Sequence, residues 1–382
     1  MQALLVSTSG MQTWHTAQAF AVRGALAEYW STSRIGPKLV SGRYRWCWPY
    51  ATAMKPFRVL MPKYYWEKAL YGLLPIWTTW IRSQPLPRVD VVHGITGFAT
   101  EIFDRAEEIG ALKVLECPNS HPTQYYGFWQ RECDVWCPGE QVVVPRWMFA
   151  RMNRELERAD VVLCSSLFVR DTMLANGIPS SKLLLQPNGV DTSLFHPRQD
   201  VPPSPRFISG GAIGLRKGFQ YLFRAFELVK QACPDAELIC VGSYKYDFVL
   251  ERKQWGGRFT HLRDMPQAEF AKLMQTGTAF VLPSVEEGLA RVIVEAMASG
   301  LPIVASYESG ATTLIEDGRE GFIVRGRDPA HIAEAMIRLA KDKDLNRKVG
   351  EAAYRKGTVK NTWQDYGDRL IAEYERRIRE RP

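Results

Sequence analysis

Two glutamates, Glu287 and Glu295, stand eight residues apart on a predicted loop and helix. A rise of about 1.5 Å per residue separates them by roughly 12 Å along the helix axis. The unpaired N–H groups of the first helical turn lie near Glu287 and attract an anion. A nucleotide sugar has about this shape, because its diphosphate lies between two groups that carry hydroxyls. Two solvated surface acids would show the same spacing, so the spacing alone leaves both interpretations open.

A strand, a loop and a helix must position these acids. Residues 279–282 form a short apolar run that ends at Pro-Ser, which predicts a buried strand. From Leu289, apolar residues recur at helical spacing up to Gly300, which predicts a helix followed by a glycine cap. Residues 303–305 predict a second strand. This order is typical of a parallel sheet, in which ligands bind at the carboxyl ends of the strands.

A glycine-rich segment opens the C-terminal half of the chain. Gly211 follows an apolar run, and Gly218 precedes a predicted helix. Glycines let a ligand approach the backbone closely, and Arg216 and Lys217 between them bring positive charge. The segment therefore predicts a second set of contacts to a diphosphate.

The run from Glu286 to Ser306 resembles the E-x7-E signature of family 4 retaining glycosyltransferases, also called group 1 glycosyltransferases. The resemblance implies the GT-B architecture, an α/β fold of two Rossmann-like domains with a cleft between them. It also implies that a sugar passes, with its anomeric configuration kept, from a nucleotide-sugar donor to a hydroxyl of a glycan or lipid-linked acceptor. Members of the family need no obligatory metal and no other cofactor.

By the same resemblance, Glu287 contacts the donor sugar, Glu295 the ribose, and Lys217 with Arg216 the donor phosphates. The chain departs from the family pattern at Ala212, where an arginine is usual. The expected donor-binding residues are Gly211, Arg216, Lys217, Arg263, Met265, Glu287, Gly288, Leu289, Ala290 and Glu295.

A histidine close to the anomeric carbon is also implied by the family. His121 follows the predicted strand 113–117 and is the match, with His93 as the reserve candidate. A histidine that only caps a turn is the alternative. The expected catalytic residues are thus His121 and Glu287, which orient the sugar, and Lys217, which stabilises the departing diphosphate.

The N-terminal half opens like a Rossmann-like domain. Residues 3–6 predict its first strand and 17–30 its first helix, and the loop between them has a single glycine, Gly10, where the family usually has a pair. A Pro-rich linker follows near residue 201. The expected domains are residues 1–200, with the helix 361–382 crossing back onto them, for the acceptor, and residues 201–360 for the nucleotide sugar.

Residues 43–88 combine many aromatic side chains with eight basic residues and one acid. Indole rings among cations suit an anionic membrane surface. The same aromatics could stack on acceptor sugars, and an inserted helical pair with its own small core explains them equally well. No recognised nucleic-acid-binding module accompanies the segment, so nucleic acid is not an expected partner.

Length and composition fit two globular domains. The chain has 382 residues, of which 46% are hydrophobic and 24% charged, and its net charge of +8 is too mild to identify a partner. Its seven cysteines are scattered, which argues against a disulfide framework. We see neither a signal-peptide pattern nor an apolar run of about 18 residues. A cytoplasmic protein is expected, either free or peripheral on the inner face of the membrane.

Two rival functions remain open at this level. The first is a catalytically degenerate GT-B protein that binds a nucleotide or a membrane without turnover, suggested by Ala212, Ala290 and the single Gly10. The second is a GT-B sugar-nucleotide epimerase or an inverting transferase, because such enzymes share the architecture.

Overall fold

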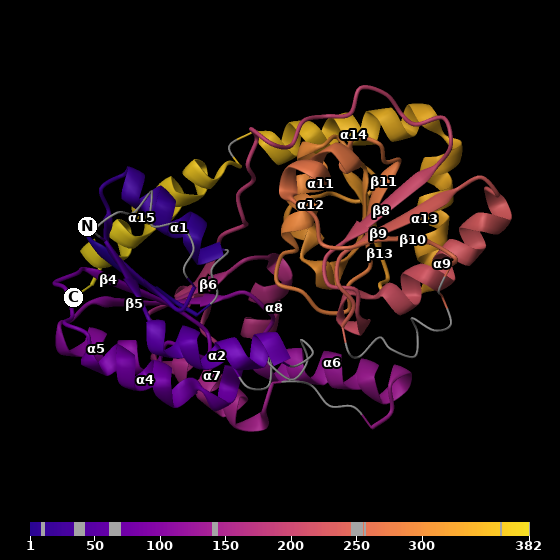
Figure 1. Cartoon of the computed structure of the whole chain (residues 1–382). Coiled ribbons are helices and arrows are strands. Elements are labelled where there is room, and N and C mark those ends of the chain that lie inside the picture. The colour runs from indigo at the N-terminus through magenta and orange to yellow at the C-terminus, as the bar shows by residue number, and fades with distance from the viewer. Residues whose placement is uncertain are drawn as a thin grey trace.

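The computed structural model describes residues 1–8, 12–33, 43–60, 70–139, 144–245, 255, 257–359 and 361–381. Within them the chain forms two parallel β-sheets, each with helices on both faces, which lie side by side in Figure 1. Gly10 and the part of the aromatic segment at 61–69 lie outside the described residues.

The N-terminal half contributes a sheet of seven strands in the order β3-β2-β1-β4-β5-β6-β7. Its strands are β1 (Ala3–Ser7), β2 (Leu26–Ser31), β3 (Tyr44–Trp46), β4 (Val91–Ile95), β5 (Leu112–Cys117), β6 (Val161–Cys164) and β7 (Leu183–Leu185). The helices that pack around it are α1 (Gln12–Val22), α2 (Trp48–Leu60), α4 (Leu74–Ser83), α5 (Thr100–Glu108), α6 (Pro122–Trp136), α7 (Arg146–Arg158) and α8 (Leu167–Ala175).

Alternation of side chains along β1 divides the core of this half into two layers. Leu4 joins the buried cluster that contains Phe103 of α5, whereas Leu5 joins the cluster that contains Phe20 of α1. The sheet is therefore buried on both faces, which explains why its strands are nearly continuous apolar runs.

The helix expected over 17–30 is wrong in its bounds. α1 begins earlier and ends at Val22, after which Gly24 turns the chain at φ 68°. The rest of the expected helix is β2, where Tyr29 and Trp30 are buried in opposite core layers. Neighbouring side chains of a strand point to opposite faces, so only a strand buries both aromatic rings here.

The C-terminal half contributes a sheet of six strands in the order β10-β9-β8-β11-β12-β13. Its strands are β8 (Arg206–Gly210), β9 (Glu237–Val241), β10 (Thr260–Leu262), β11 (Ala279–Leu282), β12 (Ile303–Ser306) and β13 (Gly321–Val324). Its helices are α9 (Phe219–Ala232), α11 (Gln267–Met274), α12 (Arg291–Ala298), α13 (Pro329–Lys341) and α14 (Lys343–Thr358), with a 3-10 turn η2 (Leu215–Lys217) before α9.

The predicted strand-helix-strand unit is present as β11, α12 and β12. Gly300 follows the helix at φ 70°, as the glycine cap requires. The helix begins at Arg291, two residues later than the apolar pattern indicates, because Leu289 and Ala290 belong to the extended approach to the helix.

The last helix, α15 (Trp363–Arg379), returns to the N-terminal half. It opens with a capping box in which Thr362 and Asp365 satisfy each other's backbone N–H groups. Its Tyr366, Leu370 and Tyr374 are buried in the core layer of α1. Figure 1 shows α15 beside α1 on the first sheet, whereas the preceding helix α14 covers the second.

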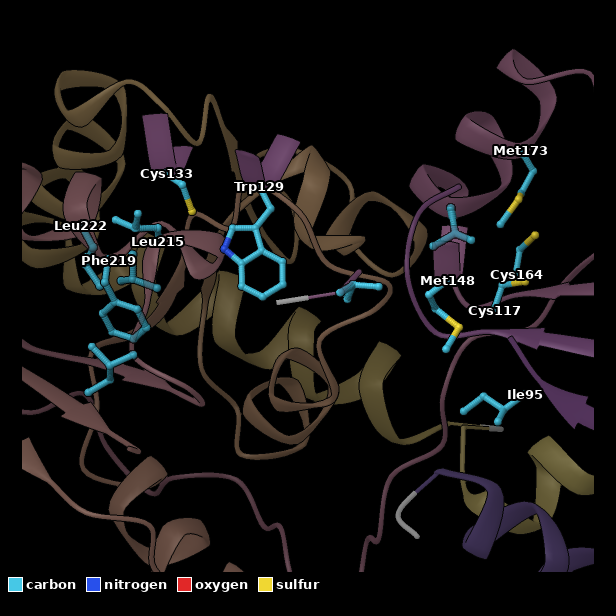
Figure 2. Packing of buried hydrophobic residues seen from close by; sticks show 14 of the residues in the cluster. Ile95, Cys117, Trp129, Cys133, Met148, Cys164, Met173, Leu215, Phe219 and Leu222 are labelled. Carbon is cyan, nitrogen blue, oxygen red and sulfur yellow. The ribbon is translucent and has the colours of Figure 1, made fainter. Parts of the chain in front are cut away.

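One buried cluster runs across both halves of the molecule (Figure 2). It includes Ile95 and Met173 from the first half, Leu215 and Phe219 from the second, and Trp129 of α6, which Figure 2 shows between the two groups. The helix α6 starts beneath the first sheet and reaches η2 of the second half. It is therefore the main apolar bridge between the two halves.

Candidate active site

The loop 283–290 between β11 and α12 holds the first glutamate at the carboxyl edge of the second sheet. Gly218 packs directly against this loop. Its φ is 73°, and a Cβ atom there would lie 1.9 Å from the Pro283 oxygen, so only glycine has both the conformation and the room. This close contact brings Arg216 and Lys217 against the loop.

Two cations and one carboxylate form the centre of the site. Lys217 Nζ lies 2.7 Å from Glu287 Oε2, and Arg216 Nη1 lies 3.3 Å from Glu287 Oε1. Burial opposes ionisation of Glu287, but the two cations outweigh it and lower the pKa of this carboxyl to about 2. Glu287 is therefore an ionised ligand and not a proton donor at neutral pH.

Gly211 makes room for the lysine. A Cβ atom at Gly211 would lie 2.9 Å from Lys217 Cε, and its φ of 110° also excludes other residues. The structure thus brings together the glycine and the lysine that the sequence placed in one phosphate-binding segment.

Glu295 lies further along α12 and is 8% exposed. Its Oε1 accepts a hydrogen bond of 3.0 Å from Gln267 Nε2 at the start of α11. Burial raises the pKa of Glu295, while Arg291 and Gln267 oppose the shift. Arg263 and Met265 lie in the segment just before α11, Arg263 exposed and Met265 half-buried.

Glu286, which the sequence did not single out, ties the site to the first half of the chain. Its Oε1 accepts hydrogen bonds from the Ser120 backbone N–H at 3.0 Å and from Ser120 Oγ at 2.9 Å. Its Oε2 lies 3.1 Å from Arg216 Nη1. Burial raises the pKa of Glu286, and Arg216 and Ser120 oppose the shift. The sequence signal for Glu286 was its position next to Glu287 in a Glu-Glu pair. Only the contacts in the structure show that the two acids have different partners.

His121 is the N-cap of α6, so the turn-cap alternative describes its local role. Its Nδ1 accepts a hydrogen bond of 3.3 Å from the Thr123 N–H, and its own backbone N–H donates to Thr172 Oγ1 at 3.0 Å. Burial lowers the pKa of His121 to about 4, so the ring is neutral at pH 7. A neutral ring that accepts at Nδ1 carries its proton on Nε2.

His93 lies away from the cleft. It is buried in β4, where its Nε2 lies 3.0 Å from Glu116 Oε2 and its Nδ1 lies 3.2 Å from the Tyr374 hydroxyl. Because Tyr374 belongs to α15, this ring faces the core layer of α1. The reserve candidate is thus part of the polar interior of the first half.

A cavity of about 230 Å³ lies next to the cations, between the two halves. Arg216, Lys217 and Lys245 line it from the second half, and Tyr125 and Trp129 of α6 line it from the first. Clustered cations on low-dielectric walls favour an anion in such a space.

Three further predicted residues, Gly288, Leu289 and Ala290, offer no side chain to a ligand. The side chains of Leu289 and Ala290 are buried in the core of the second half, so they do not face a ligand. A Cβ atom at Gly288 would lie 1.8 Å from the Pro118 oxygen, so the missing side chain allows the two halves to touch. In the described ranges, no group of three His, Cys, Asp or Glu residues could hold a metal ion.

Solved structures share the fold of this chain. Sucrose-phosphate synthase from Thermosynechococcus elongatus has a TM-score of 0.76 to this chain, with 100% of both chains covered and 17% identity. Anabaena HepE in complex with UDP and glucose has a TM-score of 0.70, with 98% of this chain and 100% of that chain covered and 15% identity. At these identities the likeness shows the fold alone. The fold is GT-B, as the sequence predicted.

Sequence comparison finds similarity to one family. Residues 204–342 match the family model described as Glycosyl transferases group 1. The chain is 29% identical over 238 residues to sulfoquinovosyl transferase SQD2 of Arabidopsis thaliana, which covers 58% of this chain and 45% of that protein. It is 27% identical over 351 residues to the MMP alpha-(1->4)-mannosyltransferase of Mycolicibacterium hassiacum, which covers 85% and 82%. The C-terminal half of the chain is thus similar to the group 1 glycosyltransferases, and the match to the Mycolicibacterium hassiacum enzyme extends the similarity into the N-terminal half.

Coverage of the relatives is partial. The matches to SQD2, to the alpha-maltose-1-phosphate synthase and to the phosphatidylinositol monomannoside mannosyltransferase of Mycolicibacterium smegmatis span 45%, 64% and 61% of those proteins.

Proposed function

We propose that the protein is a retaining, metal-independent glycosyltransferase that moves a sugar from a nucleotide-sugar donor to a hydroxyl of a glycan or lipid-linked acceptor. One observation carries the proposal. The cations Arg216 and Lys217 meet Glu287 at the N-terminus of α12, and Glu295 lies further along the same helix. The names of the relatives, which include several mannosyltransferases, and the neighbours solved with UDP support the same class.

The charges of the site suit an incoming diphosphate. Arg216 and Lys217 carry two positive charges, and Glu286 and Glu287 balance them in the absence of a ligand. A diphosphate in the adjacent cavity recruits Lys217 away from Glu287, and the positive end of the α12 dipole adds to the attraction. The same groups stabilise the negative charge that grows on the phosphate as the sugar leaves.

The two acids spaced eight residues apart hold the ends of the donor. Glu287 is ionised and accepts hydrogen bonds from sugar hydroxyls, while Glu295, bonded to Gln267, receives the ribose. His121, whose neutral ring carries its proton on Nε2, orients the sugar. In this scheme the leaving phosphate accepts the proton of the acceptor hydroxyl, so no side chain acts as a nucleophile.

Ligand-dependent stabilisation tests the donor site. The purified protein is heated with UDP, GDP, ADP and their sugar conjugates in the presence of EDTA. We expect one nucleotide to raise the melting temperature in the wild type and to lose that effect in Lys217→Ala and Glu295→Gln. Turnover of Lys217→Ala should fall on the order of a hundredfold, because one charge on the leaving group is lost.

Lys272→Ala is the matched control, since Lys272 is an exposed lysine on α11 of the same half. Normal turnover by Lys217→Ala would refute the phosphate role. Nucleotide binding without any turnover in the wild type would favour the degenerate GT-B protein, and a product of opposite anomeric configuration would refute retention.

A membrane location is part of the proposal. The helix α2 exposes Trp48, Val59 and Leu60 at 61%, 80% and 78% of their surface, together with Lys55. Exposed indole and aliphatic groups beside a lysine suit the headgroup region of an anionic bilayer. Across the described residues, no helix has the length and apolar character to span a membrane, so we propose peripheral attachment.

A further inference from the structure

A second cavity, of about 250 Å³, opens beside the first one. It lies at the carboxyl ends of strands of the first sheet, where Ile95 ends β4 and Cys117 ends β5. Both cavities are lined by Leu70, Tyr71, Tyr125 and Val144. The two spaces therefore adjoin across these four side chains, one over the cations of the second half and the other inside the first half.

The lining of the second cavity is apolar. Its described wall contains Ile95, Phe98, Met152 and Met173, and none of the residues named in that wall is Asp, Glu, Lys, Arg or His. Beside the cation-lined cavity there is thus a space whose described wall offers no charged side chain to a phosphate or a carboxylate.

Three polar side chains of this wall already form hydrogen bonds within the protein. Thr96 Oγ1 donates a hydrogen bond of 2.7 Å to the Glu116 carbonyl, and Ser120 Oγ donates one of 2.9 Å to Glu286. The amide of Asn119 donates to Glu286 at 3.4 Å. A sugar ring in this space would replace few of its hydrogen bonds to water, which is costly for each hydroxyl left without a partner.

Resting on the proposed function, we propose that this cavity binds the apolar part of the acceptor. The acceptor is an alcohol whose compact ring or alkyl group fills the cavity and whose hydroxyl sits at the junction beside Tyr125. At about 30 Å³ for each water-sized unit, the cavity holds roughly eight such units, the size of a phenyl or octyl group. The acceptor is therefore recognised through its lipid or aglycone side.

The reaction at the junction balances. The acceptor oxygen forms a bond to the anomeric carbon as the bond from that carbon to the phosphate oxygen breaks. The hydroxyl proton passes to the departing phosphate oxygen, which Lys217 and Arg216 stabilise. No further reactant is needed, and the apolar cavity lowers the chance that water takes the place of the acceptor.

A chain-length series tests the cavity without knowledge of the donor. Binding of 1-butanol, 1-hexanol, 1-octanol and 1-decanol to the whole protein is measured by saturation-transfer NMR, with and without the nucleotide that stabilises it. We expect affinity to rise about fourfold for each added methylene and to level off near octanol, where the cavity is full. Glycerol, glucose and myo-inositol 1-phosphate should not compete with octanol.

A filling variant locates the binding. Met152 lies half-buried on α7 and lines only the apolar cavity of the two. Met152→Trp should weaken octanol binding about tenfold, whereas Met152→Leu, which keeps the volume, should stay within about twofold of the wild type. Both variants should keep the wild-type response to nucleotide, which shows that they are folded and that the donor site is intact.

The outcomes separate this inference from the proposed function. Octanol binding that depends on Met152, in a protein that binds no nucleotide, would support the cavity and refute the transferase. Nucleotide binding together with glucose or inositol phosphate binding at the Met152 site, or alkanol affinity that does not change with length, would overturn the apolar acceptor. If a short-chain diacylglycerol binds more tightly than 2-phenylethanol, the apolar group of the acceptor belongs to a lipid. If 2-phenylethanol binds more tightly, it belongs to a soluble aglycone.

Discussion

At the scale of single residues, Glu287 owes its charge to its neighbours. Burial alone would raise the pKa of this carboxyl, but Arg216 and Lys217 hold it at about 2. The same contacts leave the two cations partly neutralised until a ligand arrives. In the proposed site, the negative charge of Glu287 therefore weakens nucleotide binding but helps to position the sugar.

Glu287→Gln should separate these two effects. Loss of the negative charge frees Lys217 and Arg216, so the affinity for the nucleoside diphosphate should equal or exceed that of the wild type. Turnover should fall on the order of a hundredfold, because the sugar loses a charged hydrogen-bond acceptor that orients it. Calorimetry measures the nucleotide affinity, and a transfer assay on the same preparation measures the turnover. A parallel loss of affinity and turnover would contradict the assignment of Glu287 to the sugar.

His121 links the pH to the stability of α6. Its pKa is about 4 in the folded protein and about 6.5 when unfolded, so the unfolded chain binds the extra proton first as the pH falls. The stabilising contribution is complete above about pH 6.5 and is lost as the pH falls toward 4. Protonation also removes the Nδ1 acceptor of the helix cap.

His121→Asn should flatten this dependence. Asparagine caps helices well and does not titrate, so the free energy of unfolding should fall less between about pH 7.5 and about pH 5 than in the wild type. Urea unfolding at both pH values measures it. His196→Asn, at an exposed histidine, is the control and should follow the wild type; an equal loss in all three proteins would rule out His121 as the source.

At the scale of secondary structure, α12 joins chemistry to packing. One face of the helix buries Ile293 and Met297 in the core, and this packing fixes where Glu295 and the helix N-terminus lie. Gly218, beneath the loop before α12, permits the contact that sets Lys217 opposite Glu287. The position of the charges thus follows from apolar burial and one glycine.

The helix α2 provides an element that can be tested separately from the site. If it rests on lipid, vesicles that contain anionic lipid should retain the protein, and high salt should weaken the binding. The double variant Trp48→Ala with Leu60→Ser should lose most of it in a sedimentation assay. Val359→Ser, which alters an exposed aliphatic residue of the other half, is the control. Absence of binding at every salt concentration would remove the membrane from the proposal.

At the scale of the whole molecule, Glu132 of α6 holds the two halves together. It is 2% exposed, and three groups of the second half donate to it: Gln220 Nε2 at 2.9 Å, the Tyr221 hydroxyl at 2.8 Å and Arg327 Nε at 2.7 Å. The hydrogen bond from Ser120 to Glu286 is a second buried contact between the two halves.

Glu132→Ala should therefore favour an open molecule. Removing one partner of a buried charged network costs about 3 kcal/mol, here taken from the closed arrangement. We expect a larger radius of gyration in small-angle scattering and a weaker response to nucleotide. Asp134→Ala alters an exposed acid on the same helix and should leave both unchanged. An unchanged radius with Glu132→Ala would show that the apolar contacts of Trp129 suffice.

Local patterns in the sequence determined the unit of β11, α12 and β12, the pairing of Gly211 with Lys217, and the GT-B class, because apolar periodicity, glycine positions and short motifs depend on neighbouring residues. The same periodicity wrongly predicted a helix over the residues of β2. Tyr29 and Trp30 are buried on opposite faces of the sheet, and the local sequence does not reveal that both faces are packed.

Tertiary structure alone decided how distant segments meet. It assigned Glu286 to Ser120 rather than to the donor, moved His93 into the core of the first half, and opened an apolar cavity beside the donor cations. These contacts join segments more than twenty residues apart, and their geometry depends on how whole sheets and helices pack against each other. No local pattern of residues records that packing, and for this reason the sequence could group Gly211, Lys217 and Glu287 but could not reveal the apolar cavity.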